Sequence, residues 1–359
     1  MLQSLRRSAN VEYQKLRRLF HIKDFATLIR PYVFLMSVLG YFPYSVSLST
    51  HKLAKMNFVW SLILLIHITS LCLMLTYKTM FATEYLDFYM RLYCGSVYFL
   101  GLICLWTSYL SSRTKLHFLR MVSHATRLLS PETFCRTAKW MFTIDIIKIS
   151  ILISSVFMIN YNLWSITYYM SSMYIFLVIL TANSLFINSL YLVRLCFRKI
   201  NASLEKLGTS LATDEPHLLR RVYHSRKNPA LLSQLKTLRK QHLQLCKIVD
   251  TSNETFGVET IATILFIVID ITFNLYMYLI ENTYDGKIVR VWSVHMEYLI
   301  QSCQSLIMMA VVCEMMKDQA KNIGYNIHRI HVITFDEEII TEVRKAGGRR
   351  PAFCRYRTN

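Results

Sequence analysis

The ionisable residues Asp145, Lys148 and Asp270 lie inside long apolar segments of this 359-residue chain, where a charge is costly and is by default a candidate for function. Asp145 and Lys148 are three residues apart, so on a helix they share one face and can neutralise each other as a structural pair. Asp270 has no basic residue within a helical turn, and Asn274 shares its face four residues further on. An unpaired carboxylate there needs a partner from another helix, a water-filled cavity or a ligand hydroxyl. Both a ligand-binding role and a structural hydrogen bond therefore remain open for Asp270.

Aromatic and hydrogen-bonding side chains occur at the same predicted depth as this carboxylate. Aromatic rings could cover the apolar face of a ligand while amides, an imidazole and a carboxylate bond its polar groups. The candidate ligand-binding residues are Tyr168, Tyr169, Asp270, Asn274, Trp292, His295 and Gln301. For each aromatic residue alone, the alternative is the aromatic belt at the membrane interface. The chemistry suits a small polyol or an alkaloid-like molecule, with sugars slightly favoured.

No motif for catalysis or cofactor binding is present in the sequence. It contains no G-x-S-x-G, H-E-x-x-H or phosphate-binding loop, and its nine cysteines include no C-x-x-C. We therefore expect neither an enzyme nor a cofactor, and neither a zinc site nor a disulfide framework.

These side chains must be positioned by membrane-spanning helices. Charged residues make up only 18% of the chain, against about 25% in soluble proteins, and 53% of residues are apolar. The apolar residues fall in blocks long enough to cross a bilayer as helices. The six predicted spans are Asn57–Tyr77, Met90–Ser111, Met141–Asn160, Tyr168–Leu195, Thr255–Ile280 and Trp292–Met316. The sequence thus predicts an all-α, polytopic transmembrane bundle.

The distribution of Lys and Arg predicts the topology. If the Pro-interrupted stretch Thr27–Ser49 is an interfacial, non-spanning element, residues 1–56 carry nine Lys and Arg, and the segments 112–139, 198–254 and 317–359 carry six, eleven and nine. The opposite loops carry few, as the positive-inside rule requires. We expect a cytoplasmic N-terminal region (1–56), a six-span bundle (57–316) and a cytoplasmic helix with a basic tail (317–359). The net charge of +19 then reflects topology and contact with membrane lipid, not nucleic acid.

The long inner segment 198–254 carries helical periodicity. Apolar residues recur at alternating spacings of three and four from Val193 to Leu211 and again from Leu231 to Val249, with His242 in the second stripe. Such stripes predict that the fourth span continues into the cytosol and pairs with a helix that leads into the fifth. A third stripe, from Ala320 to Ile330, would join them. A single hairpin is the alternative, and His242 is interpreted as a structural residue.

Several of these features resemble the insect gustatory receptors. The resemblance rests on three segments: Leu39-Gly40-Tyr41-Phe42-Pro43-Tyr44 before the first span, the helical stretch Leu243–Gly257 that opens the fifth span, and Cys313 followed by the helix Ala320–Ile330. The resemblance covers roughly residues 25–343. It implies a plasma-membrane, tetrameric, ligand-gated and non-selective cation channel of homo- or heteromeric subunits. Each subunit would bind a small tastant within its own helical bundle.

The chain departs from this family's pattern at its end. The family's pore-lining seventh span closes with a signature like Thr-Tyr-x5-Gln-Phe, whereas residues 345–359 are basic and non-periodic. The sequence therefore predicts six spans without a pore helix, and a non-conducting subunit of the family is one alternative. A G-protein-coupled receptor is another, although the predicted cytoplasmic N-terminus and the lack of Asp-Arg-Tyr after the third span oppose it. A transporter would show inverted repeats, which we do not find.

Overall fold

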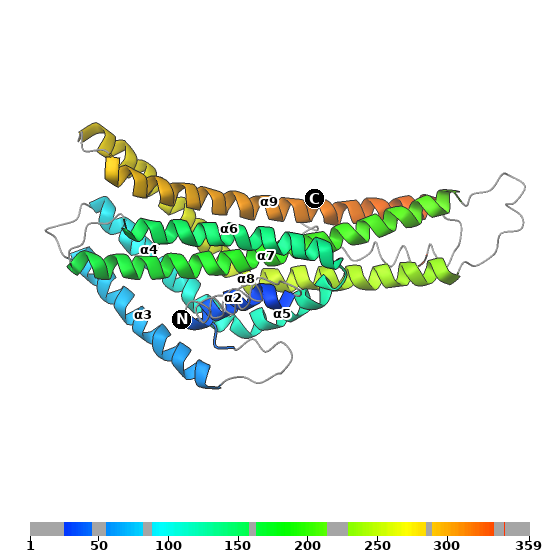
Figure 1. Cartoon of the computed structure of the whole chain (residues 1–359), viewed down its shortest axis with the longest axis horizontal. Helices are drawn as coiled ribbons and strands as arrows, with labels where there is room; N and C mark the ends of the chain where they lie inside the picture. The colour runs from blue at the N-terminus through cyan, green and yellow to red at the C-terminus, as the bar shows by residue number, and fades with distance from the viewer. Residues whose placement is uncertain are drawn as a thin grey trace, which may run out of the picture.

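The chain folds into a bundle of helices, and no strand occurs among the residues that the structure describes. This structure is a computed structural model that describes residues 25–44, 55–81, 88–157, 163–213, 229–284, 289–333 and 341. The helices are α2 (Phe25–Val38), α3 (Lys55–Phe81), α4 (Phe88–Leu110), α5 (Ser112–Thr126), α6 (Pro131–Phe157), α7 (Leu163–Thr213), α8 (Pro229–Tyr284) and α9 (Val289–Ile333). Figure 1 shows an elongated molecule in which α6, α7, α8 and α9 follow the long axis. The predicted all-helical class is confirmed.

Five helices are long and apolar enough to cross a membrane, and they contain five of the six predicted spans. Their apolar segments are Phe58–Phe81, Arg91–Leu110, Met170–Ser210, Leu231–Tyr276 and Leu299–Ile330. The remaining predicted span, Met141–Asn160, lies in α6 as far as Phe157 and then leaves the described residues. At 27 residues, α6 has the length to cross a bilayer, since each residue adds about 1.5 Å. The spanning role of α6 stays a prediction.

The stretch Thr27–Ser49 contains the short helix α2. With 14 residues, α2 is about 21 Å long and too short to cross a ~30 Å apolar layer. Its apolar face packs against α7 and α5 instead. Gly40 follows the helix with a φ of 81°, which favours glycine, and Tyr41 and Phe42 are fully buried behind this turn. The Tyr174 hydroxyl of α7 donates to the Leu39 carbonyl at 2.5 Å and anchors the turn.

The predicted stripes are buried where α7, α8 and α9 extend beyond the spans. Phe197 and Ile200 of α7, Leu235 of α8 and Ile323 of α9 are each about 1% exposed. Asn201 of α7 donates to the Gln319 carbonyl of α9 at 2.8 Å. The extensions therefore form one packed unit, and Figure 1 shows the ends of α7 and α8 running on past the other helices.

His242 lies in the part of α8 that precedes the predicted fifth span. Its ring packs edge-on against Phe197 of α7, with the ring centroids 6.1 Å apart, and its Nε2 lies 3.5 Å from the Cys246 sulfur. Burial lowers the pKa of His242, so the imidazole is neutral at pH 7. This environment agrees with the structural role expected from its position in the stripe.

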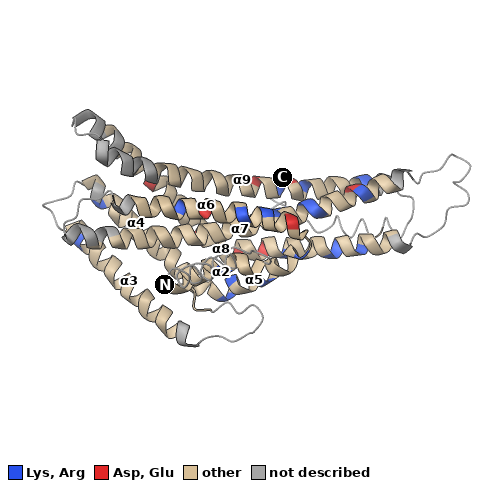
Figure 2. Ribbon diagram, viewed as in Figure 1, with Lys and Arg blue, Asp and Glu red and all other residues tan. Residues whose placement is uncertain are grey.

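Lys and Arg are unevenly distributed along the molecule. Figure 2 shows them concentrated in the half where α7 ends and α8 begins, with few among the other described residues. The described parts of the predicted cytoplasmic segments 198–254 and 317–359 lie in this half. The distribution supports the predicted topology.

Gly101 of α4 lies against Ile175 of α7. A Cβ at Gly101 would lie 2.4 Å from Ile175 Cγ2, closer than real Cβ atoms approach. We expect Gly101→Ala to lower the free energy of unfolding by about 1–3 kcal/mol because the two helices must separate. Fluorescence-detected size-exclusion chromatography after heating measures this loss. Gly324→Ala is the matched control, since nothing lies within 4 Å of its Cβ position. Equal melting of both variants would contradict the close approach.

Candidate functional site

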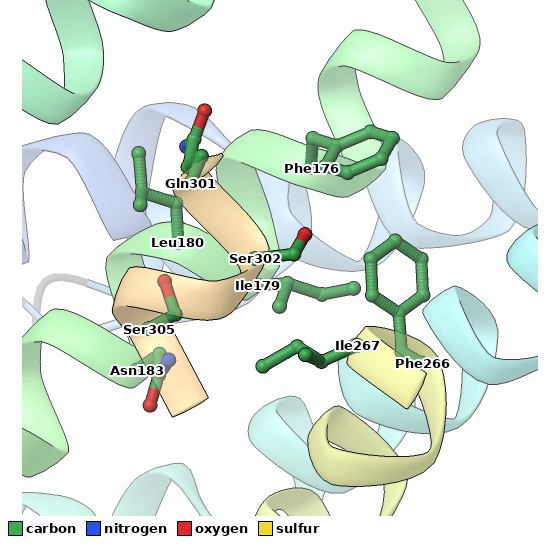
Figure 3. Close-up of a pocket in the computed structure, with 9 residues that line it drawn as sticks. All are labelled: Phe176, Ile179, Leu180, Asn183, Phe266, Ile267, Gln301, Ser302 and Ser305. Atoms are coloured by element: carbon green, nitrogen blue, oxygen red, sulfur yellow. The ribbon is translucent and has the colours of Figure 1, made fainter. Parts of the chain in front are cut away.

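A small cavity lies among three helices at the middle of the bundle. It is lined by Phe176, Ile179, Leu180 and Asn183 of α7, Phe266 and Ile267 of α8, and Gln301, Ser302 and Ser305 of α9 (Figure 3). The α7 residues fall at positions i, i+3, i+4 and i+7, which form one helical face. In each helix these positions are near the middle of the predicted span, so the cavity lies at membrane depth.

The cavity has an apolar side and a polar side. The rings of Phe176 and Phe266 meet edge to face at 5.1 Å and join α7 to α8. Figure 3 shows these rings on one side and Asn183 with Ser305 on the other. The side chains of Asn183, Gln301 and Ser305 form the polar side, and each residue is at most 8% exposed. Amide and hydroxyl groups both donate and accept hydrogen bonds, so this side is suited to a polar group from outside the chain.

The size of the cavity limits what it can hold in this conformation. Its volume of about 30 Å³ for the centre of a water-sized molecule has room for about two waters. An engineered cavity that binds benzene measures about 150 Å³. A larger ligand can enter only if α7, α8 and α9 move apart.

Asp270 of α8 lies behind the cavity as the centre of a hydrogen-bond network. Its carboxylate is fully buried and accepts from Ser302 of α9 at 2.6 Å, Tyr93 of α4 at 2.7 Å and Asn274 at 3.1 Å. The Tyr93 ring stacks on Phe273 at 3.8 Å. Because Ser302 also lines the cavity, a single hydroxyl connects the cavity wall to the buried carboxylate.

The candidate residues from the sequence differ in where they lie. Gln301 lines the cavity, and Asp270 and Asn274 lie one layer behind it. The side chains of four others lie outside the described residues, although their backbones belong to α7 or α9: Tyr168, Tyr169, Trp292 and His295. The structure adds Asn183, Ser302 and Ser305, which are small polar residues that the sequence did not single out.

A buried ion pair that the sequence did not predict lies on the face of α8 that packs on α4 and α5. Lys115 of α5 and Glu259 of α8 are joined at 2.5 Å, with side chains 0% and 5% exposed. Ser108 of α4 donates to Glu259 at 2.6 Å and accepts from Lys115 at 2.8 Å, so three helices meet in one network. The Lys115 ammonium also lies 5.1 Å from the centre of the Phe256 ring. Glu259 lies inside the predicted fifth span, which is the signal that could have found it.

A further buried network contains the predicted pair Asp145 and Lys148 of α6. Their side chains lie 3.5 Å apart, so the two charges face each other as expected. Asp145 accepts closer hydrogen bonds from Ser184 at 2.8 Å and Asn188 at 2.7 Å, both of α7, and a further one from Tyr32 of α2. The carboxylate therefore ties α2, α6 and α7 together and has a structural role.

The described residues contain no cluster of three or more His, Cys, Asp or Glu side chains that could hold a metal ion. The chemistry that the site offers is recognition through a few hydrogen bonds and apolar contacts. This is typical of binding sites for small molecules, which are mostly apolar with a few placed polar groups.

Comparisons with known proteins agree with this architecture. A family model described as 7tm chemosensory receptor matches residues 29–339. The structure of the insect olfactory receptor OR5 from Machilis hrabei is similar, with a TM-score of 0.65, 8% identity and coverage of 89% of this chain and 87% of that one. The same receptor in complex with eugenol gives a TM-score of 0.58 and 10% identity over the same shares. A search of curated proteins finds no match.

At such low identity the structural likeness shows the fold alone. The family model covers most of the sequence, and the family is one of receptors rather than of enzymes. This multi-pass helical protein therefore belongs to the 7tm chemosensory receptor family.

Proposed function

We propose that the protein is a gustatory receptor, a subunit of a ligand-gated, non-selective cation channel in the plasma membrane. A small tastant would bind in the cavity among α7, α8 and α9. The observation that carries the proposal is the cavity itself, where the polar side chains of Asn183, Gln301 and Ser305 face an apolar wall at the depth of the predicted spans. The family supplies the receptor class, and the resemblance to insect gustatory receptors supplies the channel activity.

The lining favours a mostly apolar ligand over a sugar. Five of the nine lining residues are apolar, and the polar ones could bond only a few ligand groups. A sugar would have to place most of its hydroxyls against apolar side chains, where unpaired polar groups are costly. A bitter-type molecule such as a phenol or an alkaloid fits better. OR5 from Machilis hrabei has been solved with eugenol, a small phenol, which supports this ligand class.

Binding would be coupled to channel opening through a change in population. The cavity of about 30 Å³ is too small for such a ligand, so the ligand would favour a conformation in which α7, α8 and α9 lie further apart. α9 extends from the cavity at Gln301 to Ile333, where it packs against α7. A shift of α9 would therefore reach the cytoplasmic extensions. Assembly as a homo- or hetero-tetramer with related subunits belongs to the same proposal.

Currents from cells that express the chain test the function. We expect a panel of small phenols, alkaloids and sugars to yield agonists that open a cation conductance in excised patches. Persistence in an excised patch separates a channel from a G-protein-coupled receptor. Currents that require co-expression of a related receptor would indicate a non-conducting subunit. The absence of any response under both conditions would contradict the proposal.

Asn183→Leu tests the location of the ligand. Leucine keeps the side-chain size but removes the amide, so an agonist that bonds this group should lose potency by about ten-fold or more. The half-maximal agonist concentration measures the loss, normalised to receptor at the cell surface. Asn322→Leu is the matched control, because Asn322 is exposed on the α9 extension. If both variants respond like the wild type, the cavity is not the ligand site.

A further inference from the structure

Trp140 of α6 and Tyr191 of α7 mark a membrane boundary on the outside of the bundle. Their ring centroids lie 5.8 Å apart, and Trp140 is 48% exposed. Trp140 directly precedes the predicted third span, and Tyr191 lies in the last turn of the predicted fourth. Trp and Tyr are enriched at this depth because one end of the ring is apolar and the other is polar.

Arg194 of α7 lies beside these rings, and no described residue provides it with an anionic partner. Its guanidinium carbon is 5.3 Å from the centre of the Tyr191 ring. Its Nε is shielded from solvent, and the described part of the chain offers it neither a hydrogen-bond acceptor nor a carboxylate within ion-pair distance. Contact with the ring restricts the rotation of the guanidinium. It therefore loses little conformational entropy when it donates hydrogen bonds to an anion from outside the chain.

More cations lie on the same faces of the two helices. Arg136 and Trp140 are four residues apart on α6, next to Lys139, and Arg198 is four residues after Arg194 on α7. Arg136, Lys139 and Arg198 are exposed. The acidic residue Glu132 lies nearby, in the first turn of α6, and is exposed. The patch therefore carries a net positive charge.

The surface beside this patch, toward the middle of the membrane, is apolar. Ile146, Ile147 and Ile153 of α6 are 43%, 51% and 51% exposed. An occupant that satisfies both surfaces has an anionic head and an apolar chain. Arg binds phosphate through paired hydrogen bonds, and basic residues near the membrane surface attract anionic lipids.

We propose that Arg194, with Arg136, Lys139 and Arg198, forms a binding site for the headgroup of an anionic phospholipid between α6 and α7. α6 packs mainly on α7 and α9, so its position depends on few protein contacts. A lipid bound to both helices holds α6 in place. The site is separate from the cavity and does not depend on the identity of the tastant.

Thermal unfolding of the full-length receptor in detergent tests this site. Short-chain phosphatidylserine should raise the melting temperature, whereas phosphatidylcholine of the same chain length and inorganic phosphate should not. Arg194→Gln should reduce retention of phosphatidylserine in native mass spectrometry by about ten-fold, and Arg329→Gln, an exposed arginine on the α9 extension, should not.

Three results of these experiments would contradict the lipid site. Equal stabilisation by both lipids, or by phosphate alone, would overturn it, as would unchanged retention in Arg194→Gln. If Arg194→Gln does not fold, the surface variant Arg136→Gln/Lys139→Gln replaces it, because both side chains are exposed. Wild-type retention in that double variant would also overturn the proposal.

Discussion

Lys115→Met is expected to destabilise the receptor by about 3–5 kcal/mol, because it leaves the Glu259 carboxylate buried without its cation. The ammonium of Lys115 is fully buried and lies 2.5 Å from Glu259, and Ser108 completes the network. Methionine fills a similar volume, so the effect comes from the charge and not from a cavity. A loss of this size is a large part of the stability of an ordinary protein. Heating in detergent, followed by size-exclusion chromatography, measures it as a lower melting temperature and a smaller folded fraction.

The matched control is Lys317→Met. Lys317 and Glu314 of α9 are also 2.5 Å apart, but their side chains are 20% and 60% exposed. Exposed pairs contribute about 0–1 kcal/mol, so this variant should melt close to the wild type. A second test is the double variant Lys115→Met/Glu259→Leu, which removes both charges. It should recover most of the lost stability, since replacing a whole buried pair by apolar residues is often neutral. A double variant as unstable as Lys115→Met would show that the charge imbalance is not the cause.

The sequence predicted the helical class because apolar blocks of span length are typical of helices that cross a membrane. It also predicted the stripes on α7 and α8, since spacings of three and four place Phe197 on the apolar face of α7 and His242 on that of α8. These side chains are buried against each other in the structure. Local periodicity therefore carried most of the information about the fold.

The sequence could not predict which helices meet. The spacing of Asp270 and Asn274 placed them on one face, and the structure has the hydrogen bond between them at 3.1 Å. The other donors to Asp270 are Tyr93 and Ser302, which lie 177 and 32 residues away along the chain. Lys115 and Glu259 are 144 residues apart. No local pattern encodes such pairs, because they depend on the packing of whole helices.

The cavity illustrates the same limit. Aromatic residues and amides were the candidates from the sequence, and Gln301 does line the cavity. Asn183, Ser302 and Ser305 lie inside apolar helices, where a small polar residue usually bonds its own backbone. Only the arrangement of three helices distinguishes a side chain that faces a cavity from one that does not.

Asp270→Asn is expected to change which agonists the receptor prefers. With a carboxylate behind it, the Ser302 hydroxyl must donate to Asp270, so its lone pairs are available on the cavity side. Ser302 then accepts a hydrogen bond from a ligand hydroxyl. An asparagine at position 270 has an amide that can donate to Ser302, so the serine proton can turn toward the cavity. An agonist hydroxyl must then accept from Ser302 instead of donating to it, so it should lose its advantage of about ten-fold, the value of one hydrogen bond, over an agonist that can only accept.

The measurement compares a phenolic or alcoholic agonist with its methyl ether, which accepts hydrogen bonds but cannot donate them. In Asp270→Asn the potency of the hydroxyl compound should fall relative to that of the ether, because the reversed Ser302 hydroxyl now suits an acceptor. Asp318→Asn, an exposed carboxylate on α9, should leave the ratio of the two potencies unchanged. If Asp270→Asn lowered both potencies equally, Asp270 would only support the fold. An unchanged dose-response for both compounds would separate this network from ligand binding altogether, since Ser302 is its one contact with the cavity among the described residues.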